Sequence, residues 1–111
     1  MTETRGLKPF VKRLDGRGET HLPLLTSETA RRMRAGMVTL RPGEECGRHS
    51  TEEYEELLIV LEGRGEAEVE GYGALALEAG RVAYIPPHTY HNVYQIDDGE
   101  LRYVYVVAPA K

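Results

Sequence analysis

The chain contains one cysteine, Cys46, and no tryptophan among its 111 residues. A single cysteine permits no internal disulfide. No apolar run approaches the length that crosses a bilayer, and residues 1–13 are charged and lack the apolar core of a secretory signal. We therefore expect a cytoplasmic protein with no membrane partner. A chain of this length lies near the usual size of one domain and can bury a modest single core.

Positive charge is also scarce, because 18 acidic residues outnumber 14 basic ones and the net charge is −4. Lysine and arginine are scattered, so the sequence offers no basic stripe for nucleic acid. The one short cluster is Arg31, Arg32 and Arg34. We interpret it as a solvated or salt-bridged surface, the alternative being a contact with an anionic substrate. The 41% hydrophobic fraction and the lack of low-complexity sequence predict a folded chain.

A sustained helical period is absent from the chain. Glycine and proline instead separate short segments rich in valine, leucine, isoleucine and tyrosine, which is typical of an all-β sandwich or barrel. Roughly eight to ten such strands favour a closed or double-sheet architecture with few exposed edges. Pro23 keeps the first of them a short edge strand. The expected strands cover residues 21–25, 33–40, 48–51, 54–61, 63–70, 74–77, 81–85, 89–95 and 101–107.

The stretch from Gly43 to Gly63 gathers a histidine, several glutamates and a tyrosine between two glycine turns. Successive side chains on a strand point to opposite faces, so His49 and Glu56, seven residues apart, would face opposite ways on one continuous strand. A turn at residues 50–53 instead places them on adjacent antiparallel strands, where they can face each other. We therefore expect a hairpin that brings an imidazole and a carboxylate into one pocket.

The apolar run that follows, residues 54–61, is largely hydrophobic on both faces. Glu56 and Leu58 share one face, and Leu57 and Ile59 share the other. A strand of this kind is expected to be covered on each side, either in the centre of a sandwich or at a subunit interface.

A second chemical stretch, residues 80–95, places two histidines on either side of a turn stiffened by two prolines. His88 occupies the turn, and His91 lies on the strand that follows it. Val93 and Gln95 share the face of His91. This arrangement brings the His91 imidazole inward.

Together the two stretches resemble the paired motifs of the cupin superfamily. The first motif is Gly, five residues, His, one residue, His, three or four residues, Glu, six residues, Gly. It matches Gly43, His49, Thr51, Glu56 and Gly63, with Thr51 standing where the second histidine is usual.

The second cupin motif is Gly, five residues, Pro, one residue, Gly, two residues, His, three residues, Asn. It matches Gly80, Pro86, His88, His91 and Gln95. Here His88 replaces the glycine and Gln95 replaces the asparagine. The resemblance spans about residues 34–107, and the two spacings occur together and in order.

The resemblance implies a small single-domain cupin, an all-β barrel of the double-stranded β-helix or jelly-roll type with a divalent metal at its mouth. We expect residues 1–20 to form an N-terminal arm and the first edge strand region, and residues 21–111 to form the barrel. Cupins of this size are commonly homodimers. The arm and the two-sided apolar run at 54–61 agree with that expectation.

Carried over by position, the metal ligands implied are His49, Glu56 and His91. Two imidazoles and a carboxylate form a facial triad suited to non-heme iron. Zinc, with three protein ligands and a water, is an equal candidate, and manganese, nickel and copper remain open. A threonine hydroxyl is a poor ligand, so Thr51 is expected to bond a bound water. Glu52 or Glu53 in the loop is an alternative ligand if its side chain turns inward.

Residues expected around the pocket include hydrophobic and aromatic side chains of the inward faces. Tyr54 is interpreted as a hydrogen-bond donor or as a packed ring. The residues expected around the pocket are Met37, Thr51, Tyr54, Leu58, Tyr84, Val93 and Tyr103.

Three further residues are interpreted as structural. His88 occupies a turn, and histidine tolerates positive φ better than β-branched residues do. His21 is expected on the surface. Cys46 has a parity opposite to that of His49, which turns it away from the site, and no Cys-His pairing at useful spacing supports nucleophilic chemistry.

Two functional classes follow. The first is a metal-dependent enzyme, such as a dioxygenase, isomerase or lyase, that acts on a small organic substrate. The second is a non-catalytic cupin or sensor that binds a small ligand and has a weakened or absent metal site. The replacement of the usual histidine by Thr51 favours this class. A purely structural module is a third class, against which the retained ligand trio argues.

Overall fold

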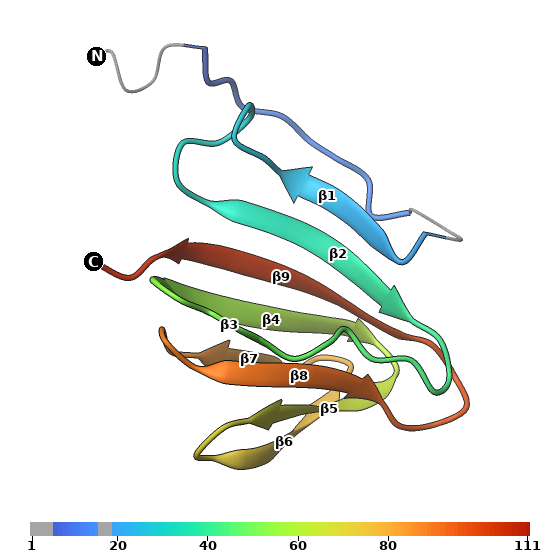
Figure 1. Cartoon of the computed structure of the whole chain (residues 1–111). Helices are drawn as coiled ribbons and strands as arrows, with labels where there is room; N and C mark the ends of the chain where they lie inside the picture. The colour runs from blue at the N-terminus through green and yellow to red at the C-terminus, as the bar shows by residue number, and fades with distance from the viewer. Residues whose placement is uncertain (1–5, 16–18) are drawn as a thin grey trace.

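The computed structural model describes residues 6–15 and 19–111 of the chain (Figure 1). Within these residues there is no helix long and apolar enough to cross a membrane. Residues 7–15 form neither helix nor strand. The strands are β1 (His21–Leu25), β2 (Arg34–Leu40), β3 (His49–Ser50), β4 (Tyr54–Glu62), β5 (Arg64–Val69), β6 (Gly73–Glu78), β7 (Val82–Ile85), β8 (Tyr90–Gln95) and β9 (Leu101–Pro109).

Two antiparallel sheets make up the fold. The five-stranded sheet has the order β1-β2-β9-β4-β7, and the four-stranded sheet has the order β3-β8-β5-β6. Figure 1 shows β1, β2, β9 and β4 in succession down the molecule, with β8, β5 and β6 in its lower part. The all-β prediction is confirmed, and β1 is an edge strand with the predicted bounds.

Strand β3 does not form a hairpin with β4, so the predicted hairpin is wrong. β3 pairs with β8, whereas β4 pairs with β9 and β7. The chain leaves one sheet and enters the other at residues 51–53, because Thr51 continues along the β8 side: its backbone N–H donates to the carbonyl of Thr89 at 3.1 Å. His49 and Glu56 therefore face each other across the space between the sheets.

Alternation along the strands fixes which side chains fill that space. In β5, Ala67 and Val69 are buried while Glu66 and Glu68 are exposed, as the sequence predicts. Each large aliphatic side chain buried in this way stabilises the fold by roughly 1.5–3 kcal/mol. The buried cluster between the sheets contains Val38, Leu40, Leu58, Val60, Ala67, Val69, Leu77, Ile85, Val93, Leu101 and Tyr103.

The outer face of β4 is only partly covered. Leu57 and Ile59 are half-buried, and Leu61 is 41% exposed. The described chain therefore does not supply the full cover that the two-sided apolar pattern predicts.

The ends of the two sequence motifs meet in the fold. The side-chain oxygen of Gln95 accepts a hydrogen bond from the backbone N–H of Gly43 at 3.1 Å, and its amide nitrogen donates to Asp97 and to the carbonyl of Gly99. Gly63 has a φ of 84° and lies against the backbone of Glu100, where no side chain fits. These positions thus shape the loops that carry the site.

Candidate metal site

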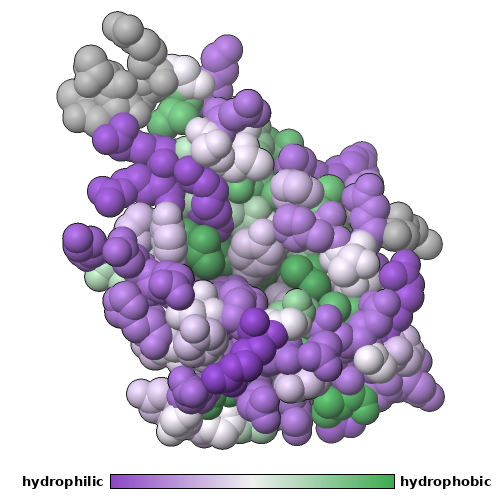
Figure 2. Space-filling view, in the orientation of Figure 1, coloured by the Kyte–Doolittle hydropathy of each residue, from purple (hydrophilic) through white to green (hydrophobic). Residues whose placement is uncertain are grey.

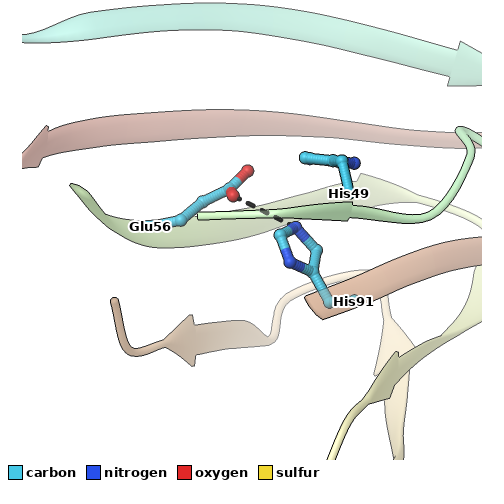
Figure 3. Close-up of side chains that lie close together, drawn as sticks. All are labelled: His49, Glu56 and His91. Atoms are coloured by element: carbon cyan, nitrogen blue, oxygen red, sulfur yellow. Dashed lines mark ion pairs between the residues drawn. The ribbon is translucent and has the colours of Figure 1, made fainter. Parts of the chain in front are cut away.

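Three side chains from three different strands converge at one point. His49 comes from β3, Glu56 from β4 and His91 from β8, and one potential ligand atom of each lies within 4.8 Å of the others. Figure 3 shows the Glu56 carboxylate and the His91 ring turned toward each other, with His49 close by on its own strand. The metal-ligand trio implied by the sequence is thus brought together.

His91 is the buried member of this trio. It is 1% exposed and lies in register between His49 on β3 and Val69 on β5. Its Nδ1 bonds the carbonyl of Thr89 at 3.2 Å, and its Nε2 lies 3.3 Å from Oε1 of Glu56. A ring whose Nδ1–H donates to a carbonyl presents the Nε2 lone pair to a metal.

The carboxylate of Glu56 makes a positive charge favourable at the centre of the trio. Burial by itself lowers the pKa of His91, but the hydrogen bond and the negative charge of Glu56, together with the carbonyl of Thr89, raise that pKa above its ordinary value. Because a carboxylate 8% exposed is costly without a positive partner, the pocket favours a proton on His91 or a cation in its place.

His49 is held in a different way, because it lies on a two-residue edge strand and is exposed. Its Nδ1 bonds the carbonyl of Gly47 at 3.0 Å, and the N–H of Gly47 donates to Oδ1 of Asn92 at 2.9 Å. Asn92 is 4% exposed and also donates to Oε1 of Glu45 at 2.8 Å. The amide of Asn92 therefore positions the loop that carries His49.

A cavity of about 310 Å³ opens beside the trio. On the face shown in Figure 2, hydrophobic surface is visible in the middle among hydrophilic side chains. A volume of this size is at the lower end of the range for small-molecule pockets. The cavity is lined by Val38, Cys46, His49, Ser50, Thr51, Tyr54, Glu56, Tyr103, Tyr105 and Val107.

Thr51 lines this cavity, but its hydroxyl is committed to the backbone. The hydroxyl donates to the carbonyl of Pro86 at 2.7 Å and accepts from the N–H of Thr89 at 3.1 Å. Its only proton is therefore not available to the bound water that the sequence led us to expect. Thr51 ties the sheet crossing to the turn before β8.

The remaining predicted pocket residues are divided between three places. Tyr54 and Tyr103 line the cavity, whereas Leu58 and Val93 are each 1% exposed and lie in the core rather than on the cavity wall. Tyr84 was expected to point inward, and that prediction is wrong: Tyr84 is 54% exposed, and its hydroxyl donates to Oε1 of Glu55 at 2.7 Å. The alternation of β7 turns its neighbour Ile85 inward instead.

Met37 is buried at 2% exposure on the face of β2 opposite to Val38, so it does not line the cavity either. Glu52 and Glu53 are exposed and are not part of the ligand trio. His88 has a φ of 55° in its turn, as its position predicts.

Five cavity residues were missed from the sequence, namely Val38, Cys46, Ser50, Tyr105 and Val107. Cys46 lines the cavity although its parity relative to His49 turned it away, because Gly47 with a φ of 102° interrupts the strand alternation between them. Burial raises the pKa of its thiol, which disfavours the thiolate. Tyr105 also lines the cavity, and the alternation from Tyr103 would have found it.

The fold and this site define an all-β double-sheet domain with two imidazoles and one carboxylate at its mouth. Residues 36–107 match the family described as Cupin domain. The chain therefore belongs to the cupin family, and the resemblance seen in its two motifs is confirmed.

Individual relatives differ in size. A protein named polyketide synthase CurC, from Streptomyces cyaneus, is 32% identical over 74 residues, which are 67% of this chain and 47% of that protein. The chain thus spans about half the length of this relative.

Solved structures share the fold over most of the chain. A Cupin 2 conserved barrel domain protein from Salinispora arenicola CNS-205 is 25% identical with a TM-score of 0.75, covering 93% of this chain and 91% of that one. An oxalate oxidase in complex with the substrate analogue glycolate is 18% identical with a TM-score of 0.78, covering 92% of this chain and 60% of that one.

Proposed function

We propose that the protein binds a divalent metal ion through His49, Glu56 and His91 and holds a small organic ligand beside it. The observation that carries this proposal is the convergence of three ligand atoms within 4.8 Å from three separate strands. Convergence of this kind is costly to build for structural reasons alone, because it places a carboxylate in a largely buried position.

The donor set fits a divalent metal. Each imidazole bonds a backbone carbonyl through Nδ1, which leaves Nε2 as the metal-binding nitrogen. Two imidazoles and one carboxylate suit iron, zinc, manganese or nickel and leave coordination positions open. A bound metal of this kind supplies Lewis acidity, or oxygen activation in the case of iron.

The residues that line the cavity determine which ligand can bind beside the metal. Val38 and Val107 line it with hydrocarbon and limit water. Burial, the largest cause, raises the pKa of Tyr103 far above its ordinary value, so this hydroxyl keeps its proton and can donate a hydrogen bond to a ligand. A cavity of about 310 Å³ accepts a small metabolite rather than a polymer.

We assign the ligand to small oxygen-bearing organic compounds, with a dioxygenase, isomerase or lyase reaction as the enzymatic form of the proposal. Support comes from the structural relative that is an oxalate oxidase in complex with the substrate analogue glycolate, since oxalate and glycolate are small organic acids. Support also comes from the apolar wall with few polar groups, which suits a compact ligand.

The alternative is a non-catalytic cupin that binds or senses a small ligand. The motif resemblance, which aligns Thr51 with the second histidine, favours it, and so does the Thr51 hydroxyl, which bonds the backbone of Pro86 and Thr89. A site with three protein ligands binds metal less tightly than a site with four.

We also propose a homodimer formed through the outer face of β4 and β7. Leu61, Val82 and Tyr84 are 41%, 64% and 54% exposed there, a grouping of apolar side chains that a second copy would cover. Sedimentation of the parent and of Val82→Asp tests this. A dimer that the substitution converts to monomer is expected, and a monomeric parent contradicts it.

The test of function is made on metal-loaded protein. Calorimetric titration with Fe(II) under anaerobic conditions, and with Zn(II), Mn(II) and Ni(II), is followed by a panel of small acids that includes oxalate and glycolate. Oxygen consumption or product formation identifies the enzyme. Ligand binding without turnover identifies the binding protein, and absence of both contradicts the proposal.

A further inference from the structure

A tyrosine and a histidine form a second polar pair at the cavity, separate from the metal trio. The hydroxyl of Tyr105 on β9 lies 2.7 Å from Nε2 of His21 on β1. The two rings are stacked, with centroids 5.7 Å apart and planes 13° from parallel. Tyr105 lines the cavity, and His21 is exposed, as the sequence predicts.

Gly36 makes this pair possible. It lies on β2, between the two strands that carry the pair, and is in register with Tyr105. A Cβ at this position would lie 2.6 Å from Nε2 of His21 and 2.7 Å from the Tyr105 hydroxyl oxygen. Glycine inside a strand is less stable than alanine, so its place here is explained by the room that the pair needs.

The register also gives the direction of the Tyr105 side chain relative to the trio. Glu56 pairs with Val107 and Leu58 pairs with Tyr105, so Glu56 and Tyr105 are diagonal neighbours on one face. The tyrosine ring then runs away from Glu56, across β2 toward β1. Since neighbouring strands are about 4.8 Å apart, the hydroxyl lies roughly two strand spacings, about 10 Å, from β4.

We propose that Tyr105 contacts the bound ligand through its hydroxyl and that His21 is the residue that positions it. This inference rests on the proposed function. It narrows the ligand to a small compound with a metal-binding oxygen pair at one end and a second polar group roughly four to six atoms away, a length comparable with the two strand spacings between β4 and the hydroxyl. Val38 and Val107 surround this path with hydrocarbon, so a ligand that lacks the second polar group gains no hydrogen bond from this hydroxyl.

Two matched probes test the assignment: N-(2-hydroxyethyl)oxamate and N-propyloxamate. Both carry the same chelating end, and they differ by a hydroxyl in place of a methyl group. Affinities are measured by calorimetry on the Zn(II)-loaded parent, on Tyr105→Phe and on Tyr84→Phe. Tyr84 is a control because its hydroxyl is outside the cavity, on Glu55.

The parent is expected to bind the hydroxyl probe more tightly than the propyl probe. Tyr105→Phe should weaken the hydroxyl probe about tenfold, the effect of one hydrogen bond, and leave the propyl probe and the zinc affinity within about twofold. Tyr84→Phe should match the parent.

The ratio of the affinities for the hydroxyl probe and the propyl probe also tests the positioning role of His21. His21→Ala should lower the preference for the hydroxyl probe, and His21→Gln, which can still bond the hydroxyl, should restore part of it. Gly36→Ala should abolish the preference without removing either ring, because the added methyl group displaces both. Melting temperatures show that each variant is folded.

The outcomes separate the inference from the function on which it rests. If the parent binds no metal, the proposed function fails. If the parent binds zinc but neither probe, or if Tyr105→Phe keeps the parent's preference, the metal site stands and the role of Tyr105 is overturned.

Discussion

His91 and His49 are direct cross-strand partners, with ring centroids 4.3 Å apart, yet the protein holds them differently. His91 is 1% exposed and flanked by strands on both sides. His49 is exposed on an edge strand of two residues. One half of the site is thus fixed by the sheet, and the other half depends on a loop.

The loop is held by the amide side chain of Asn92 and by backbone hydrogen bonds, among them the one from the N–H of Cys46 to the carbonyl of Val93 at 3.0 Å. Asn92 accepts from Gly47, whose carbonyl bonds His49, so a few hydrogen bonds rather than close packing orient the exposed imidazole. We infer that a metal meets a preformed pair, Glu56 and His91, and that His49 completes the site. Substitutions in the two halves should therefore separate stability from metal affinity.

The largest effect is expected for His91→Ala. This change removes a buried ring and leaves the carboxylate of Glu56 buried without its partner, so it should abolish metal binding. It should also lower the free energy of unfolding of the metal-free protein by about 2–4 kcal/mol. Urea denaturation measures this. His88→Gly is the control, because His88 is exposed at positive φ, and it should leave both properties near those of the parent.

His49→Ala should affect metal affinity alone. Removing a ligand should weaken zinc binding by more than about 100-fold, since even outer partners of ligands cost 10–100-fold. An exposed side chain should contribute less than about 1 kcal/mol to unfolding of the metal-free protein. Equal destabilisation by His49→Ala and His91→Ala would show that the two halves are held alike.

Asn92→Ala tests whether the amide acts through His49. It should lower metal affinity about 10–100-fold by releasing the loop. In a double-mutant cycle, adding Asn92→Ala to His49→Ala should cause little further loss of metal affinity. Fully additive losses would mean that Asn92 acts by another route.

Thr51→Val should give the smallest effect on the metal. It removes both hydrogen bonds to the turn before β8 and should destabilise the fold by about 1–3 kcal/mol. The metal stoichiometry should not change, and Thr51→Ser should behave like the parent. If the metal stoichiometry fell in Thr51→Val but not in Thr51→Ser, Thr51 would be part of the metal site.

The sequence predicted most of the fold because strand alternation is a local property. The buried and exposed faces of β5 and the short edge strand at His21–Leu25 follow from it directly. The grouping of His49, Glu56 and His91 was implied by the resemblance to the cupin motifs, whereas the hairpin expected to join His49 to Glu56 was wrong. What could not be read was the sheet to which each strand belongs, since the hydrogen bonds of Thr51 to residues 86–89 are distant in sequence.

Irregular backbone, a contact distant in sequence and an undecided strand face caused the other misses. Gly47 interrupts alternation and turns Cys46 into the cavity, which a parity count cannot foresee. The pairing of His21 with Tyr105 depends on the space at Gly36 and joins strands 84 residues apart. Tyr84 was misplaced because no feature of residues 81–85 says which face is inward.

The central claim is that His49, Glu56 and His91 are sufficient to bind a metal, although position 51 is threonine rather than histidine. Its most direct test is the metal content of protein purified without affinity-tag metals or chelators, set beside the double variant His49→Ala, His91→Ala. We predict about one divalent ion per parent chain and none in the variant. A parent without stoichiometric metal, whose melting temperature is unchanged by added Fe(II), Zn(II), Mn(II) or Ni(II), would contradict the account.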